Sequence, residues 1–201
     1  MRRGLVVLVA VVALVVLLAI MLTSQYNGLV NLQEDVTAQW AQVENVYQRR
    51  ADLIPNLVAT VKGAANFEQE TLRQVVEARA RVGQVTAQAG PSTPNDPEAL
   101  RRFAAAQDQL SSALSRLLVV VERYPELKAV QGFTDLMAAL EGSENRIAQE
   151  RRKYNELSRA FNAARRRVPA AWFISMLGWD FPPKAYFESQ PGAATAPKVE
   201  F

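Results

Sequence analysis

The most constraining feature of this chain is an apolar run near its N-terminus, without any charge, proline or polar side chain. It spans Gly4 to Leu22 and reads GLVVLVAVVALVVLLAIML. About 20 apolar residues in a helix match the hydrocarbon thickness of a bilayer. We therefore predict a short tail at 1–3, a transmembrane helix at 4–23 and a body in water after it.

A cleaved signal peptide is the alternative, because Arg2 and Arg3 form a basic start. The apolar run is longer than the core of a typical signal peptide, however, and no A-x-A-like cleavage site follows it. The chain contains no cysteine that could carry a lipid. Length and the missing cleavage site favour an uncleaved, single-pass anchor.

The basic residues near the span indicate its orientation. Arg2 and Arg3 precede it, and the next basic residues, Arg49 and Arg50, lie well beyond a short juxtamembrane segment. By the positive-inside rule this favours a cytoplasmic N-terminus with the body outside.

Composition excludes several kinds of site. Histidine and cysteine are both absent, so the chain cannot build a Ser-His-Asp or Cys-His site, a zinc site with His or Cys ligands, or a thiol redox centre. It has no glycine-rich phosphate loop, and no pair of acids stands out for carboxylate catalysis. The net charge of +3 comes from interleaved acids and bases, which is typical of a solvated surface. We predict no enzyme activity, no cofactor or metal, and no nucleic-acid partner.

Apolar residues after the span recur at helical steps in four segments. These segments run from Gln25 to Lys62, from Asn66 to Gly90, from Asp96 to Tyr124 and from Phe133 to Val168. The last holds a heptad seam of about five repeats. Short connections between helices favour antiparallel neighbours. The sequence thus predicts an all-α fold, in which the N-terminal transmembrane helix continues into an elongated antiparallel four-helix bundle over 24–169, followed by an aromatic and Pro-containing tail over 170–201.

The end of the fourth helix is a candidate membrane-surface contact. An antiparallel bundle returns it toward the bilayer, where aromatic and basic residues favour the interface and anionic headgroups. The candidate residues are Arg165, Arg166, Arg167, Trp172, Phe173 and Trp179. Alternatively, the aromatic residues close the end of the bundle core.

Four asparagines form a stripe on the first helix. Asn27, Asn31, Asn45 and Asn56 fall within about 40° of one another at 100° per residue, opposite the apolar stripe. They are candidates for an oligomer or partner contact through amide hydrogen bonds between parallel copies. The alternative is a solvated outer face.

A charge interrupts the apolar seam of the first helix and of the last. Arg50 and Glu150 occupy positions where an apolar residue is expected. We predict that they form a seam ion pair that sets the register of the two helices. The alternative is that Arg50 extends its guanidinium to water.

Three blocks of the sequence resemble the signatures of one family. They are YNGLVNLQEDVTAQWAQVENVYQRRADLIPNLVATVKG (Tyr26 to Gly63), LEGSENRIAQERRKYNELSRAFN (Leu140 to Asn162), and the ending from Gly178 through Tyr186-Phe187-Glu188 to Phe201. The chain is identified on these blocks as a member of the LemA family. The resemblance implies a membrane-anchored helical bundle in the inner membrane of a bacterium and supplies no catalytic mechanism.

Family members are linked to membrane-associated processes and cell-envelope stress. The long apolar seams, the absence of catalytic residue types and the tethering of identical copies in one membrane predict a non-enzymatic scaffold that forms a homo-oligomer or holds partner proteins at the bilayer. One alternative is a lipid-surface sensor or remodeller that acts through the aromatic and basic C-terminal end. Another is an adaptor for a membrane protease.

Overall fold

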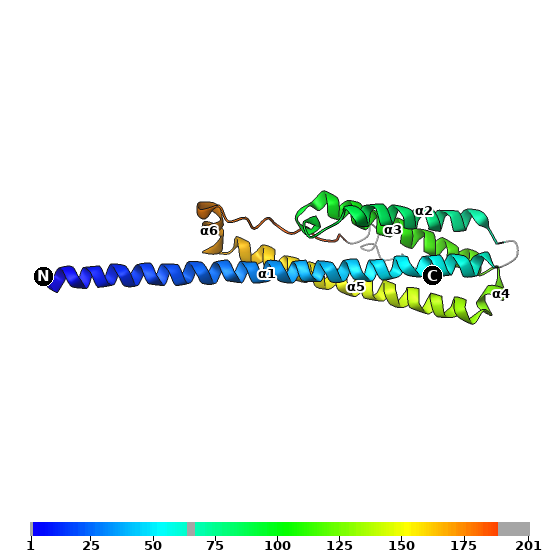
Figure 1. The fold of residues 1–201 in the computed structure, drawn as a ribbon, viewed down its shortest axis with the longest axis horizontal. Coiled ribbons are helices and arrows are strands. Elements are labelled where there is room, and N and C mark those ends of the chain that lie inside the picture. Colours follow the sequence, from blue (N-terminus) through cyan, green and yellow to red (C-terminus); the bar gives the residue numbers. More distant parts are fainter. Residues whose placement is uncertain (1, 64–66, 189–201) are drawn as a thin grey trace, which may run out of the picture.

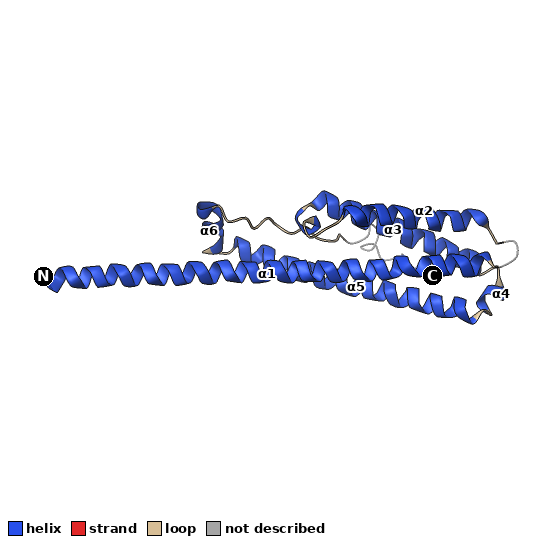
Figure 2. Cartoon of the chain, in the orientation of Figure 1, coloured by secondary structure: helices blue, strands red, loops and turns tan. Residues whose placement is uncertain are grey.

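A computed structural model describes residues 2–63 and 67–188, and every regular element in these ranges is helical (Figures 1 and 2). The α-helices are α1 (Arg2–Lys62), α2 (Gln69–Gln88), α3 (Pro97–Val121), α4 (Pro125–Lys128), α5 (Gln131–Arg166) and α6 (Ala170–Leu177), and Thr93–Asn95 forms a 3-10 turn, η1. The predicted all-α fold is therefore confirmed.

α1 is one uninterrupted helix that joins the apolar run to the bundle (Figure 1). Its N-terminal part is long and apolar enough to cross a bilayer, with a mean hydropathy of 3.6 and no buried residue. The first buried residue is Leu29, and buried residues then recur as far as Val61. The same rigid element thus serves as anchor and as one wall of the bundle, and the bundle part is about 50 Å long at 1.5 Å per residue.

The other long helices pack in two pairs. α5 runs antiparallel along α1, and α2 and α3 form an antiparallel hairpin whose backbone comes nearest to α1 at α2 (Figure 1). Within the described ranges, α3 and α5 do not pack closely on each other. The bundle consequently has an open side between these two helices.

The core has two parts with different chemistry. The part nearer the apolar run is aromatic, with Trp40 at its centre, 5.2 Å from the ring of Phe103 and 5.8 Å from that of Tyr154. The distal part is mainly aliphatic and includes Ile54 from α1 and Leu117 from α3. Fully burying an apolar side chain such as Ile54 or Leu117 contributes roughly 1.5–3 kcal/mol to the free energy of folding. Residues of this kind in the two parts of the core therefore supply most of the stability of the bundle.

Local signals explain where the helices begin and end. The Asp96 carboxylate accepts hydrogen bonds from the amides of Glu98 and Ala99, at 2.9 and 3.1 Å, and so caps α3 where the predicted helical segment begins. α3 ends at Val121, three residues before the predicted end, because the last turn loosens ahead of Pro125. α2 begins at Gln69, and its predicted first residue, 66, lies outside the described residues.

Candidate functional site

The end of the bundle next to the apolar run is built from both ends of the described chain. α6 lies beside α1 just after the apolar run (Figure 1). The Tyr26 ring of α1 meets Trp179 and Phe181 edge-on, with centroids 5.1 and 5.5 Å apart. These contacts hold the C-terminal segment within a few residues of the predicted bilayer surface.

The predicted membrane-surface residues all gather here, but they divide into two groups. Trp172 is 61% exposed, and Arg166 and Arg167 are exposed beside it in the chain. The other three make internal contacts: Arg165 Nε donates to the carbonyl of Phe181 at 2.9 Å, and the rings of Phe173 and Trp179 lie 5.6 Å apart and are half-buried. Contact of this surface with lipid stays a prediction.

After α6 the chain reverses and returns along α5. The reversal uses Gly178, whose φ of +66° is left-handed and is favourable only for glycine. The extended segment that follows is held by two side-chain amides of α5, which we call the asparagine clamps. Asn162 bonds the backbone N–H and C=O of Lys184 at 2.9 and 2.8 Å, and Asn155 bonds those of Phe187 at 2.9 and 2.9 Å.

The clamped segment, residues 181–188, is part of the core. Phe181 and Phe187 are each 5% exposed, and the Phe187 ring stacks on Trp40 at 6.1 Å. Ala185 N donates to the carbonyl of Pro94 in η1 at 2.8 Å. Through these contacts the segment covers the open side of the bundle in the half nearer the apolar run, which we call the membrane-proximal half.

Two titratable side chains hold this segment, Lys184 from within it and Tyr154 from α5. Lys184 Nζ donates to Asn95 Oδ1 at 2.6 Å and lies 5.1 Å from the Phe161 ring, and burial lowers the pKa of Lys184. The Tyr154 hydroxyl donates to the carbonyl of Ala185 at 3.1 Å, and burial raises the pKa of Tyr154 to about 12. The two hydrogen bonds therefore tie the segment to η1 and to α5.

The sequence analysis did not single out the asparagine clamps. The available signal was the spacing of Asn155 and Asn162, seven residues apart on the heptad helix, so that they share one face. A primary amide offers a donor and an acceptor together, which matches the two polar groups of one peptide unit.

A second buried polar cluster surrounds Arg50, which is only 1% exposed. Its guanidinium forms an ion pair with Glu144 of α5 and donates to Ser111 Oγ at 2.7 Å and Gln107 Oε1 at 2.6 Å on α3. It also lies 5.3 Å from the Tyr47 ring. Arg50 thus connects α1 to α3 and α5, the two helices that flank the open side of the bundle.

The predicted pair between Arg50 and Glu150 is wrong. Glu150 instead accepts a hydrogen bond from Gln39 Nε2 at 2.6 Å, which fixes the antiparallel register of α1 and α5. Gln39 and Arg50 are 11 residues apart, so the level of Arg50 is about 16 Å from that of Glu150. Glu144 lies within reach from the adjacent turns of α5 and takes the place of Glu150.

The asparagine stripe faces outward. Asn27, Asn31, Asn45 and Asn56 are all exposed on α1. Both original interpretations agree with this exposure, and the subunit contact stays a prediction.

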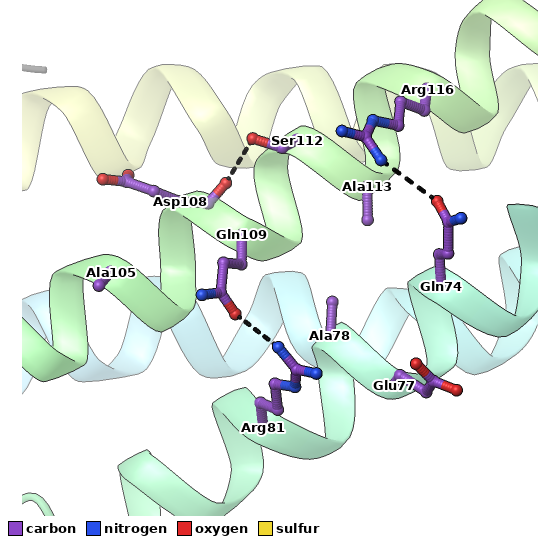
Figure 3. A pocket seen from close by; sticks show the side chains of 10 residues that line it. All are labelled: Gln74, Glu77, Ala78, Arg81, Ala105, Asp108, Gln109, Ser112, Ala113 and Arg116. Carbon is purple, nitrogen blue, oxygen red and sulfur yellow. Dashed lines mark hydrogen bonds between the residues drawn. The ribbon is translucent and has the colours of Figure 1, made fainter. Parts of the chain in front are cut away.

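A polar hollow of about 590 Å³ lies between α2 and α3 (Figure 3). Hydrogen bonds from Arg81 to Gln109 at 3.2 Å and from Arg116 to Gln74 at 3.5 Å cross it. These bonds connect the two helices of the hairpin, and we assign the hollow a structural role. Among residues 2–63 and 67–188, no cluster of three or more acidic, histidine or cysteine side chains could hold a metal ion.

Comparison with known proteins gives the family. Residues 39–201, most of the chain, match the LemA family. The chain belongs to the LemA family.

Three relatives of this LemA family protein extend the comparison. It is 26% identical to the magnetosome protein MamQ of Magnetospirillum gryphiswaldense, over 97% of this chain and 77% of MamQ. It is also 26% identical to the magnetosome protein MamQ 2 of Paramagnetospirillum magneticum, over 93% of this chain and 73% of the relative. Protein LemA of Metamycoplasma hominis is 23% identical over 68% of this chain and 58% of that protein. The apolar helix and these relatives fit a membrane-associated protein.

Proposed function

We propose that this LemA family protein is a non-enzymatic, membrane-anchored scaffold that self-associates through the outer face of α1. The observation that carries the proposal is the continuity of α1 from the apolar run to the far end of the bundle. A bundle built on its own anchor helix keeps a fixed angle to the bilayer. Several copies in one membrane therefore present the same face at the same height.

The asparagine stripe is the surface best suited to contact between such copies. Parallel anchors in one membrane raise the effective concentration of identical faces. Each amide can donate to and accept from its counterpart on another copy. The stripe begins at Asn27, just outside the apolar run, and reaches Asn56 near the distal end of α1. It therefore supports contact along the whole part of α1 that lies in the bundle.

Charges placed in this stripe should weaken self-association. We expect Asn31→Lys together with Asn45→Lys to weaken the association of the detergent-extracted full-length protein by about tenfold or more, because like charges would face each other across the contact. Light scattering with size-exclusion chromatography measures the mass. Gln84→Lys with Gln149→Lys adds the same charge at exposed positions of α2 and α5 and should leave the mass unchanged. A native protein that is strictly monomeric at micromolar concentration contradicts self-association.

Contact with the lipid surface is the second candidate function. The exposed apolar side chains of α6 support it: Trp172, Met176 and Leu177 are 61%, 81% and 54% exposed at the end of the bundle nearest the apolar run. Exposed Arg166 and Arg167 would meet anionic headgroups at the same level.

Quenching of tryptophan fluorescence tests this contact directly. In nanodiscs that contain brominated lipid, we expect the full-length protein to be quenched, and the Trp172→Phe variant to lose most of that quenching. Trp179→Phe is the control, because Trp179 packs against Tyr26 inside the protein. Equal quenching in the native protein and the Trp172→Phe variant would argue against lipid contact by α6.

A further inference from the structure

The open side of the bundle between α3 and α5 forms one continuous groove, which we call the track, and it has two halves. In the membrane-proximal half, residues 184–188 lie between Leu100 and Asp108 of α3 and Arg151 of α5. The backbone carbonyl of Glu188 accepts a hydrogen bond from Arg151 at 3.1 Å. The described chain thus ends inside the track and points toward its distal half.

The distal half is a groove of about 630 Å³ between the same two helices. Its floor is apolar and includes Leu57 of α1 and Leu117 of α3, both fully buried. Its walls include Leu118 of α3 and Met137 and Ala138 of α5. The groove therefore continues the track with the same helices and an apolar floor.

The asparagine clamps set the register of the chain along the track. Asn162 holds Lys184 and Asn155 holds Phe187. An advance of three residues along the tail therefore corresponds to seven residues along α5. Seven helical residues rise about 10.5 Å, or about 3.5 Å for each tail residue, which is the spacing of extended chain. At this rate, the level of Ala138 lies about seven residues of extended chain beyond Phe187, which is the separation of Phe187 and Ala194 in the sequence.

The chain beyond Glu188 is long enough for this path. Thirteen residues follow Glu188 in the 201-residue chain and can reach about 43 Å when extended. The distance along α5 from Arg151 to Thr134, which lines the end of the groove, is about 26 Å. The sequence from 189 to 197, SQPGAATAP, has no charge and mostly small side chains, which suits a narrow apolar groove.

We propose that the distal groove binds residues 189–197 of the same chain. A segment bound there would cover the apolar floor of the groove, including Leu57 and Leu117. The inference does not depend on self-association or on lipid contact.

Disulfide trapping in the full-length protein tests the proposal, because the chain has no other cysteine. Ala138→Cys is combined with Ala194→Cys, and mild oxidation should join them within one chain. The matched control combines Ala80→Cys with Ala194→Cys. Ala80 is exposed on α2. It lies at about the same level along the bundle as Ala138, because the neighbouring Arg79 Nε donates to the carbonyl of Ala51 at 3.0 Å and the antiparallel register places Ala138 level with Ala51.

We expect the intramolecular disulfide to form at least about tenfold faster in the first variant than in the control, because a docked segment has a much higher effective concentration than a tethered one. Non-reducing electrophoresis and peptide mass mapping identify the product. Equal rates in the two variants overturn the proposal. A disulfide that forms only between chains, when the single-cysteine variants are mixed, overturns it in favour of a second copy as the occupant.

Discussion

Replacing Glu144 with glutamine is expected to lower the free energy of unfolding by about 2–3 kcal/mol, because it leaves Arg50 buried without a counter-charge. Arg50 is 1% exposed, so water does not solvate its guanidinium in place of the lost carboxylate. The expected loss is smaller than for a fully buried pair, since the Glu144 side chain is 45% exposed and its attraction to Arg50 is partly screened. Urea unfolding of the full-length protein in detergent measures the change.

Glu150→Gln is the matched control for this prediction. It removes the same charge from the same helix, but its partner Gln39 is neutral and can still donate to the new amide oxygen. We expect a change below about 0.5 kcal/mol. Equal losses in the two variants would mean that Glu144 is not the counter-charge of Arg50.

Removing the asparagine clamps is expected to release the C-terminal segment from the bundle. Asn155→Leu with Asn162→Leu abolishes four hydrogen bonds to the backbone of Lys184 and Phe187, and each buried peptide group left unpaired costs about 1–3 kcal/mol. The segment can detach without unfolding the helices, so we expect the effect to be local. Hydrogen exchange at the amides of Lys184 and Phe187 should become about 100-fold faster.

Gln149→Leu controls for adding a leucine to α5, because Gln149 is exposed and lies outside the clamps. It should leave both amides as protected as in the native protein. Unchanged exchange in the clamp variant would show that the amides of Asn155 and Asn162 do not hold the segment.

The sequence predicted those parts of the fold that depend on periodicity and local caps. The apolar run and the stripe after it have no breaker between them, so α1 follows as one helix. The heptad seam predicted α5, and Asp96 followed by Pro97 predicted the start of α3. These signals are local, and each element carries its own evidence.

The parts that the sequence did not predict depend on long-range register. Arg50 and Glu150 both interrupt apolar seams, but the pairing of α1 with α5 decides which acid meets Arg50, and a displacement of six residues makes it Glu144. The clamped segment was missed because Gly178, Pro182 and Pro183 surround Phe181 and precede Phe187, and such residues suggest a loose tail. Their burial depends on a gap between α3 and α5 that no local pattern reveals.

We predict that α1 holds the bundle with α6 at the bilayer and α4 far from it. A spin label attached at Met176→Cys in α6, or at Lys128→Cys in α4, can test this in nanodiscs whose lipid headgroups chelate nickel. Met176 and Lys128 are both exposed, and Tyr26 and Lys62 of α1 are about 54 Å apart. We predict strong relaxation by nickel at position 176 and none above that of free label at position 128. Equal relaxation at the two positions, or the reverse order, would contradict this arrangement.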